Sequence, residues 1–402
     1  MGLPHNQRQT EGQRNPHATV SVSASDSDLP WLIAAIHIYI YILLDAMRVS
    51  HLRLPILSRT THKPMAAVAN RKRPAPDDGA CAVATTTMSN KKRAPCRLRS
   101  IHEYEQLEVL GKGSYGVVVK ARDRLTGETV AIKSNLVGGA DDLIREASFL
   151  AVFLGHPSIV QIRGVAADDA DDGNTNNLFL VMEFVGPSLR TVLVRQRRRF
   201  SEAEAREPMR QLLGAATKLH GAKMIHRDIK PGNILVGDSG ELKLCDFGTV
   251  TKAMRDETTP YPEERVGTML YRSPEQLRGI RCYGPAVDVW ALGCVMYELL
   301  AGEPLFGDAW TEEDVLIAAG NLRDDILYYS SGPEAFGRLP EPLSPSGAEV
   351  LCGLLCFDHE QRFTAAEALG QRWFTEGSEA ELSALPWQMK TAQEMRPPMV
   401  SV

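Results

Sequence analysis

The chain has 402 residues, of which 44% are hydrophobic and 24% charged, and its formal net charge is −5 at pH 7. This length leaves room for roughly two to three domains, and the composition is that of a globular protein with a sizeable core, which excludes a fibrous chain. The charge is uneven, because residues 65–100 carry eight Lys or Arg against two Asp and precede an acidic remainder. This asymmetry suggests separate roles for the two parts.

The cysteines favour a reducing cytosolic or nuclear compartment. Their number is odd and none forms a Cys-x-x-Cys pair, so we expect neither a disulfide framework nor a zinc site. The seven are Cys81, Cys96, Cys245, Cys282, Cys294, Cys352 and Cys356.

Residues 1–100 show no sustained helical or strand periodicity, so we expect an extension that is mostly disordered. Within it, the apolar run Leu29–Leu44 has about sixteen residues, fewer than the ~20 that a membrane-spanning helix needs. A membrane anchor is therefore less favoured than an adventitious extension. Met65 looks like a natural protein start, which leaves open whether residues 1–64 belong to the mature protein.

Two basic clusters, residues 71–73 and 91–93, lie in the same extension together with Arg97 and Arg99. They are typical of a nuclear localisation signal, and the alternative is a solvated run of charge. The protein is thus expected in the nucleus, the cytoplasm or both. Direct binding to nucleic acid is not expected, because no aromatic residues are interleaved with the charges.

From Glu105 onwards the pattern is that of an α+β protein, with a strand-rich part before a helix-rich part. The stretch 105–133 alternates apolar and polar residues around a glycine-rich turn and a Leu-Thr-Gly turn, which predicts strand, turn, strand, turn, strand. Segment 168–177 is polar and predicts a surface loop. The later predicted elements are a helix over Leu143–Phe153, a strand over Leu178–Phe184 and amphipathic helices over Glu202–His220 and Ala286–Leu300.

A glycine-rich loop connects the first two predicted strands. Its strand-to-strand setting argues against a dinucleotide-binding fold, in which a helix would follow. Glycine allows the backbone to close over a polyphosphate without interference from side chains, although glycines occur in any tight turn and the motif alone is weak. The loop consists of Gly111, Lys112, Gly113, Ser114, Tyr115 and Gly116, and Val118 follows it.

Lys133 is a cation inside the apolar run of the third predicted strand. A lysine buried there without a partner would be costly, and Glu146 on the following helix is the candidate partner. Together the two residues would hold the α- and β-phosphates of a nucleotide. The alternative is a solubilising lysine on an edge strand.

The most specific motif is His-Arg-Asp-Ile-Lys-Pro-Gly-Asn over residues 226–233. In it, Asp228 can accept the proton of an attacking hydroxyl, Lys230 can neutralise a transferring phosphoryl group, and Asn233 can offer an amide oxygen to Mg²⁺. Asp246, in an Asp-Phe-Gly motif, can supply the main carboxylate ligand, because Mg²⁺ prefers hard oxygen ligands. Such a site works by positioning and charge stabilisation.

In this order, the motifs resemble those of the eukaryotic protein kinases over roughly 270 residues. The resemblance implies a bilobal fold over residues 104–374, a C-terminal tail over 375–402, and ATP and Mg²⁺ as cofactors. It also implies an ion pair between Glu275 of a Ser-Pro-Glu motif and Arg362. Asp288 would brace the catalytic loop, the segment of residues 226–233. Lys230 together with Thr268 is similar to the serine/threonine class.

Within that class the chain most resembles the cyclin-dependent kinases, through GKGSYGVVVKARDRLTGETVAIK and YRSPEQLRG. The resemblance implies roles in the cell cycle and inhibitory phosphorylation at Ser114 and Tyr115, whose alternative is a loop tip. It further implies an adenine pocket with Met182 as gatekeeper and the backbone of Glu183 and Val185 as readers. The other pocket walls would be Val118, Ala131 and Leu235.

Four departures from that family limit the expectation. The residues before Glu146 differ from the cyclin-contacting helix, so a cyclin-type activator is doubtful, and the region 306–351 is short. Glu263 stands at the usual phosphothreonine position, where it could pair with Arg227; the alternative is phosphorylation of Thr258, Thr259 or Tyr261. Gly267 replaces the usual Val or Ala before Thr268, which is similar to the plant F-type branch and leaves open whether the specificity is proline-directed.

The sequence therefore predicts an enzyme that transfers the γ-phosphate of ATP to Ser or Thr hydroxyls of protein substrates, with a monomeric catalytic domain. The alternative is a pseudokinase or scaffold that binds partners without catalysis. Its usual sign is the loss of the strand lysine or of a motif aspartate, and Lys133, Asp228 and Asp246 are all present.

Overall fold

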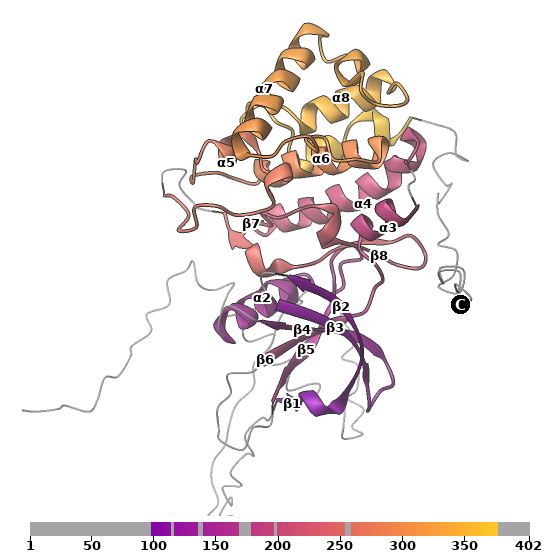
Figure 1. Ribbon diagram of the computed structural model, residues 1–402, viewed down its shortest axis with the longest axis vertical. Coiled ribbons are helices and arrows are strands. Elements are labelled where there is room, and N and C mark those ends of the chain that lie inside the picture. The colour runs from indigo at the N-terminus through magenta and orange to yellow at the C-terminus, as the bar shows by residue number, and fades with distance from the viewer. Residues whose placement is uncertain are drawn as a thin grey trace, which may run out of the picture.

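The computed structural model describes residues 98–113, 116–135, 140–168, 178–196, 199–253 and 259–376. They form a lobe built on a β-sheet and a lobe built on helices, which confirms the predicted bilobal α+β fold (Figure 1). The apolar run and basic clusters of the extension, Ser114, Tyr115 and most of the polar loop 168–177 lie outside the described residues, as does nearly all of the C-terminal tail.

The N-terminal lobe is a six-stranded sheet in which β2, β3 and β4 follow one another as antiparallel neighbours, as the sequence predicts. Helix α2 (Ala140–Val152) packs against β5 and β6 through Leu143, Ala147 and Leu150. In spatial order the strands are β1 (Arg99–Ser100), β5 (Ile162–Ala167), β6 (Leu178–Glu183), β4 (Thr129–Asn135), β3 (Gly116–Asp123) and β2 (Tyr104–Gly113).

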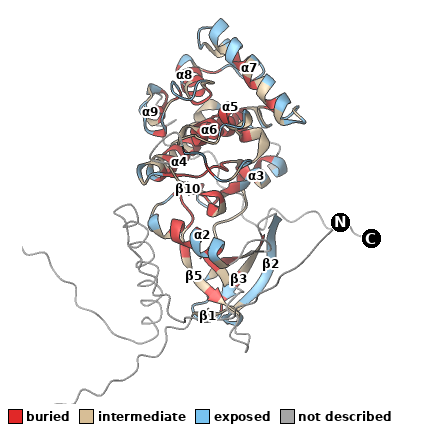
Figure 2. Ribbon diagram, turned by 90° about the vertical axis from the view of Figure 1, so that its left-hand side faces the viewer, coloured by how far each residue is buried: buried red, intermediate tan, exposed pale blue. Residues whose placement is uncertain are grey.

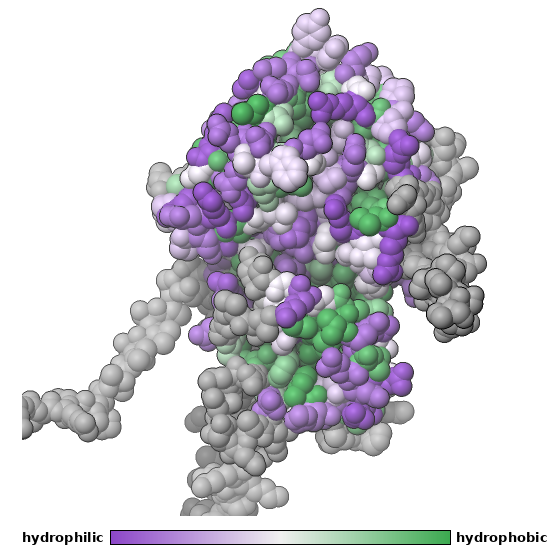
Figure 3. Space-filling view, in the orientation of Figure 1, coloured by the Kyte–Doolittle hydropathy of each residue, from purple (hydrophilic) through white to green (hydrophobic). Residues whose placement is uncertain are grey.

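Strand β2 lies at the edge of this sheet and is mostly exposed, whereas the helices of the other lobe enclose buried segments (Figure 2). Apolar surface gathers on the sheet lobe in Figure 3, and β2 contributes exposed Leu107, Val109 and Leu110 to that lobe. In the described sheet β2 has one strand neighbour, β3, so these side chains have strand neighbours on one side only.

Helix α6 (Ala286–Ala301) passes through the core of the C-terminal lobe and is buried on all sides from Val287 to Leu300. The prediction of an amphipathic helix here is wrong, because the helix is surrounded by protein and has no solvent-facing stripe. Helix α4 (Glu202–Gly221) is amphipathic as predicted and begins at a capping box formed by Ser201 and Glu204. The other helices are α3 (Leu189–Gln196), α5 (Pro274–Leu277), α7 (Glu312–Tyr328), α8 (Pro345–Leu354) and α9 (Ala365–Leu369).

Two short antiparallel strand pairs lie where the lobes meet, and only the first of them is a hairpin. Strand β8 (Ile234–Val236) pairs with β9 (Leu242–Leu244), and β7 (Met224–Ile225) pairs with β10 (Thr251–Lys252). The amide of Val160 donates to the carbonyl of Leu244 at 2.9 Å, so the segment after α2 is attached to the C-terminal lobe. In the part of the chain that the structure describes, no helix has the length and apolar character to cross a membrane.

Predicted and observed boundaries of these elements differ by at most three residues, and the starts of α4, α6 and β6 coincide. Helix α2 begins at Ala140, three residues before the prediction, because its first turn is polar and breaks the apolar pattern on which the prediction depends. Phe153, predicted as its last residue, lies in the turn after the helix.

Candidate active site

Lys133 on β4 lies between two carboxylates from different parts of the chain. Its Nζ is 2.9 and 2.8 Å from the two carboxylate oxygens of Glu146 on α2 and 2.7 Å from Oδ1 of Asp246. Burial works to lower the pKa of the Lys133 ammonium, but the two carboxylates outweigh it and the pKa lies above its ordinary value. The predicted pair with Glu146 is confirmed, and the edge-strand alternative is excluded because Lys133 is 5% exposed and lies between β3 and β6.

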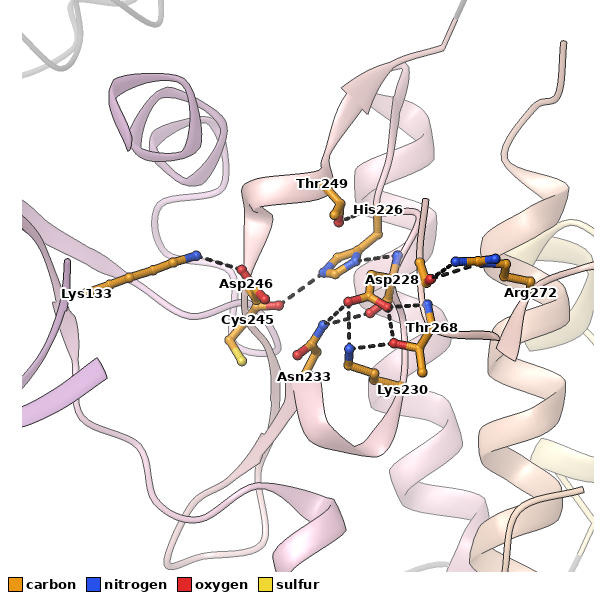
Figure 4. Close-up of polar contacts among 11 residues, drawn as sticks. Lys133, His226, Asp228, Lys230, Asn233, Cys245, Asp246, Thr249, Thr268 and Arg272 are labelled. Atoms are coloured by element: carbon orange, nitrogen blue, oxygen red, sulfur yellow. Dashed lines mark hydrogen bonds and ion pairs between the residues drawn. The ribbon is translucent and has the colours of Figure 1, made fainter. Parts of the chain in front are cut away.

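Asp246 connects this cluster to the catalytic loop. It adopts a left-handed backbone conformation, with φ 61° and ψ 75°, which non-glycine residues rarely do. Burial opposes ionisation of Asp246, yet Lys133 holds its pKa below the ordinary value. The carbonyl of Cys245, the preceding residue, contacts Nε2 of His226 at 3.2 Å (Figure 4).

Asp288 on α6 holds the backbone of the catalytic loop in place through hydrogen bonds. Its carboxylate accepts hydrogen bonds from the backbone amides of His226 and Arg227, each at 2.8 Å, and lies 2.9 Å from Nε2 of His220. Asp288 is 1% exposed, and these contacts keep the pKa of the carboxyl below its ordinary value although burial works to raise it. The contacts with the loop backbone agree with the bracing role that the resemblance implies for Asp288.

Asp228 is the centre of the catalytic loop, and Figure 4 shows Lys230, Asn233 and Thr268 converging on it. Oδ1 accepts hydrogen bonds from the amide and the hydroxyl of Thr268, at 2.9 and 2.8 Å. Oδ2 accepts from Nζ of Lys230 at 2.8 Å and from Nδ2 of Asn233 at 2.9 Å. Lys230 also contacts the Thr268 hydroxyl at 2.6 Å, so three residues of the motif at 226–233 and the distant Thr268 form one cluster.

Arg227, next to Asp228, connects the catalytic loop to the segment between Asp246 and Glu275. Its guanidinium donates to both carboxylate oxygens of Glu263, at 3.0 and 3.2 Å, and to the carbonyl of Thr249 at 2.7 Å. The hydrogen bond from Arg227 lowers the pKa of Glu263 below its ordinary value. The predicted pairing of these two residues is confirmed.

Gly267 precedes Thr268 in a left-handed conformation, with φ 84°. A Cβ at this position would lie 2.4 Å from the carbonyl oxygen of Arg227, so glycine fits a close approach of two backbone segments. The carbonyl of Gly267 accepts hydrogen bonds from Nε and Nη2 of Arg272, at 3.0 and 2.7 Å. Nη1 of Arg272 in turn contacts Oε1 of Glu312 at 2.6 Å.

Most of the residues predicted to hold a nucleotide lie on the six-stranded sheet, and Leu235 lies on the separate β8–β9 pair. Gly113 pairs with Gly116 at the end of the β2–β3 hairpin, with Lys112 and Gly111 in register behind it, whereas the predicted Ser114 and Tyr115 are not described. Ala131 and Met182 are register partners across β4 and β6, and Val118 faces Lys133 in the neighbouring pair. Leu235 lies on β8, and Glu183 and Val185 lie at and just after the end of β6.

Oxygen donors suited to a divalent cation lie between the two clusters. Within the described residues, the Asn233 amide nitrogen is engaged by the carbonyl and carboxylate of Asp228, which leaves the amide oxygen as a donor. Asp246 uses Oδ1 for Lys133 and retains Oδ2. Within the described ranges, no group of three or more acidic, His or Cys side chains forms a metal cage. An amide oxygen and a carboxylate oxygen are hard donors of the kind that Mg²⁺ takes together with phosphate and water oxygens.

Sequence reasoning missed several residues of this site. Arg272 belongs to the quoted YRSPEQLRG run but received no role, and Glu312 stands forty positions further along in no motif. His226 was part of the motif without a role, yet its Nδ1 accepts the amide of Asp228 at 3.3 Å. Their place in a quoted motif was the signal for Arg272 and His226, and no motif contains Glu312.

Comparisons with known proteins agree with this geometry. The family model described as protein kinase domain matches residues 104–374. The chain belongs to the protein kinase family. As a kinase of this family, it has the sheet lobe, helical lobe and interlobe cluster described above, and the family generally uses ATP and a divalent metal.

The relatives by sequence carry cyclin-dependent kinase names. The chain is 40% identical over 299 residues to "Putative cyclin-dependent kinase F-2" of Oryza sativa subsp. japonica, covering 69% of this chain and 91% of that protein. It is 35% identical over 306 residues to cyclin-dependent kinase G-1 of Oryza sativa subsp. indica, covering 69% and 43%. Cyclin-dependent kinase-like 2 of Oryctolagus cuniculus is 36% identical over 319 residues, covering 74% and 55%. The protein is thus a serine/threonine kinase similar to the cyclin-dependent kinases, and nothing favours the pseudokinase alternative.

Proposed function

We propose that this kinase transfers the γ-phosphate of ATP to a Ser or Thr hydroxyl of a protein substrate bound next to Asp228. The site residues have the roles that the sequence predicts for them. The observation that supports this most is the convergence of two clusters: Lys133 with Glu146 and Asp246, and Asp228 with Lys230, Asn233 and Thr268. Residues up to 113 positions apart meet at the junction of the lobes. Burying charged side chains costs desolvation free energy, and such groups gather preferentially at functional sites. Two adjacent clusters of this kind therefore favour a catalytic role over a purely structural one.

In the proposed mechanism, Asp228 accepts the proton of the substrate hydroxyl while its oxygen forms the new bond to phosphorus and the bond to the ADP oxygen breaks. Lys230 lies 2.8 Å from Asp228 and is placed to stabilise the charge of the phosphoryl group. Lys133, held by Glu146, positions the phosphates of the nucleotide. Asp228 then releases its proton to solvent.

We propose Mg²⁺ as the metal, held by the amide oxygen of Asn233 and the carboxylate of Asp246. When bound, the ion supplies neutralisation of phosphate charge. Hard oxygen ligands with room for water support Mg²⁺ over a metal that prefers nitrogen or sulfur.

The test of the role of Asp228 is the Asp228→Asn variant, which keeps the shape of the side chain but removes the proton acceptor. We expect turnover on a Ser or Thr peptide to fall by roughly 10²- to 10⁴-fold while nucleotide binding persists, because the phosphate-holding residues are unchanged. Peptide phosphorylation and binding of a fluorescent nucleotide measure the two effects. Asp238→Asn, an exposed aspartate in the β8–β9 turn, is the matched control. Full turnover of Asp228→Asn would end the assignment.

For the residue after the phosphoacceptor, we propose a preference for proline. The Gly267 carbonyl next to Thr268 is occupied by two donors of Arg272, so it offers no acceptor to a substrate N–H. Proline has no N–H and loses nothing there, whereas any other residue leaves a donor unpaired.

We also propose that Glu263 substitutes for a phosphorylated residue in ordering the segment between Asp246 and Glu275. Its bidentate contact with Arg227 supports this, since an arginine fork matches a carboxylate as it matches a phosphate. Thr259 and Tyr261 are described and Thr258 is not; phosphorylation of one of them remains the alternative.

Location and partners are proposed from sequence alone. The basic clusters at residues 71–73 and 91–93 support a nuclear or cytoplasmic protein. The names of the relatives contain the words cyclin-dependent and so support a cyclin-type activator, whereas the altered sequence before Glu146 argues against one. A cell-cycle role is proposed from the family resemblance of the sequence. We further propose a catalytic domain that works as a monomer on protein substrates and is itself phosphorylated.

A further inference from the structure

Helix α7 contacts the substrate-binding side of the site at one point. Glu312, the first residue of α7, places Oε1 2.6 Å from Nη1 of Arg272. The two side chains are largely shielded, at 14% and 32% exposure for Arg272 and Glu312. Among the described residues, Arg265 also lies near Glu312, with its Nε 3.8 Å away, and its side chain is 77% exposed.

Arg272 connects Glu312 to the backbone of Gly267, the residue before Thr268. Its Nε and Nη2 both donate to the Gly267 carbonyl, and Figure 4 shows the Arg272 guanidinium directed toward the Asp228 cluster. Gly267 is held in its left-handed conformation, and Thr268, the next residue, donates to Asp228 through both its amide and its hydroxyl. A chain of contacts therefore runs from α7 to the proposed base.

The energetics explain why Glu312 matters to this chain. A free arginine side chain loses rotamer entropy when it is fixed, and the carbonyl of Gly267 is a neutral acceptor at one edge of the guanidinium. The carboxylate of Glu312 binds the remaining donor, Nη1, with a short charge-assisted contact. Without it, Arg272 regains mobility and the carbonyl becomes available to other donors.

We propose that Glu312 is a positioning residue that sets the specificity for the residue after the phosphoacceptor. By fixing Arg272 it keeps the Gly267 carbonyl occupied and so disfavours substrates that carry an N–H at that point. This inference rests on the proposed function and adds a determinant on α7 to it.

The test compares two peptides that differ only in having Pro or Ala after the acceptor serine, assayed with the full-length kinase and Mg·ATP. The variant is Glu312→Ala, and the matched control is Glu313→Ala, which removes the same charge from the same helical turn at an exposed position. Helix α7 keeps its start in both, because Thr311 and Asp314 form a capping box. Melting temperatures of both variants report folding.

In Glu312→Ala we expect the ratio of kcat/KM for the Pro peptide over the Ala peptide to fall roughly three- to tenfold, with the KM for ATP unchanged. Glu313→Ala should leave the ratio as in the wild type. Arg272→Ala alone should lower this ratio. Adding Glu312→Ala to Arg272→Ala should not lower the ratio further, because Glu312 acts through Arg272.

An unchanged ratio in folded Glu312→Ala, or an equal loss in Glu313→Ala, would overturn the inference. A wild-type enzyme that phosphorylates neither peptide contradicts the proposed function instead. If Glu312→Ala fails to fold, Glu312→Gln keeps the length of the side chain without its charge and is read in the same way, with the same expected fall in the ratio.

Discussion

Lys133 is the residue that joins the two parts of the nucleotide-binding cluster. It is 5% exposed and contacts Glu146 on α2 and Asp246 at the start of the following segment. Removing the lysine would leave Glu146, whose pKa is raised by burial, without the cation that offsets this burial. The same ammonium therefore serves both stability and phosphate binding.

The Lys133→Met variant should lose nearly all peptide phosphorylation, by roughly 10²-fold or more, because the phosphates are misplaced and Asp246 loses its partner. Nucleotide turnover assays measure the loss, and thermal unfolding should show a lower Tm. Lys120→Met, on the neighbouring strand with an exposed partner at Glu108, is the control and should keep its activity. Wild-type turnover in Lys133→Met would contradict the role assigned here.

At the scale of single residues, the sequence predicted pairs whose members both occupy positions that the family resemblance points to. Lys133 with Glu146, Arg227 with Glu263, and Glu275 with Arg362 are all present in the structure. The contact between Arg272 and Glu312 was not predictable, because nothing in the local pattern around Glu312 indicates which distant side chain it meets. The second partner of Lys133, Asp246, was assigned only to metal and was likewise missed.

Among the elements, the segment from Asp246 to Glu275 is the one whose order determines access to the site. Arg227 fixes it through Glu263, and the ring of Tyr261 packs under the Arg227 guanidinium at 5.3 Å. The pKa of Glu263 is lowered in the folded state, so its pair with Arg227 contributes fully to stability at pH values above the ordinary carboxyl pKa. That contribution is lost as the pH falls through the lowered, folded-state value.

Protein freed of phosphate by a phosphatase should therefore remain active, and Glu263→Ala should lose roughly tenfold in kcat/KM, since Arg227 then has no carboxylate to hold. Mass spectrometry checks that the segment carries no phosphate, and a peptide assay gives the rates. Glu264→Ala, at an exposed neighbouring position, is the control. Unchanged activity of Glu263→Ala, or an inactive phosphate-free wild type, would refute the substitution.

Sequence patterns predicted the order of the elements well and the surroundings of one of them badly. The apolar positions of α6 suggested a single buried face, yet residues between them, such as Trp290 and Tyr297, are buried as well. Periodicity reports which residues are apolar, not how many neighbours enclose the helix. The two acidic residues of α6 can be buried because each has hydrogen-bond partners. Asp288 accepts from the backbone of the catalytic loop, and Glu298 accepts from Tyr271 and Arg190.

Across the whole molecule, Arg362 ties the end of the segment that begins at Asp246 to the far part of the helical lobe. It donates to both oxygens of Glu275 at 2.8 and 3.1 Å, and to the carbonyls of Ala286 and Cys356. Both side chains of the ion pair are buried, at 0% and 4% exposure. This predicted contact is confirmed, and it joins regions 87 positions apart.

Breaking this pair from one side should destabilise the fold. We expect Arg362→Met to lower the free energy of unfolding by about 3–5 kcal/mol, because it removes the donor to a buried carboxylate and to the carbonyls of Ala286, Cys356 and Phe357. Arg372→Met breaks the exposed pair with Glu349 and should cost about 0–1 kcal/mol. Denaturant unfolding of both variants gives the comparison, and equal costs would contradict it.

The saturation of Asp228 has a consequence for how an acceptor enters. Both carboxylate oxygens already hold two donors each, so an arriving hydroxyl must displace one of them. The hydroxyl of Thr268 is the donor chemically equivalent to a serine or threonine side chain, and exchanging one for the other conserves the number of hydrogen bonds. Substrate entry is then a swap of like for like, and until it occurs the resting enzyme keeps its base occupied by its own alcohol.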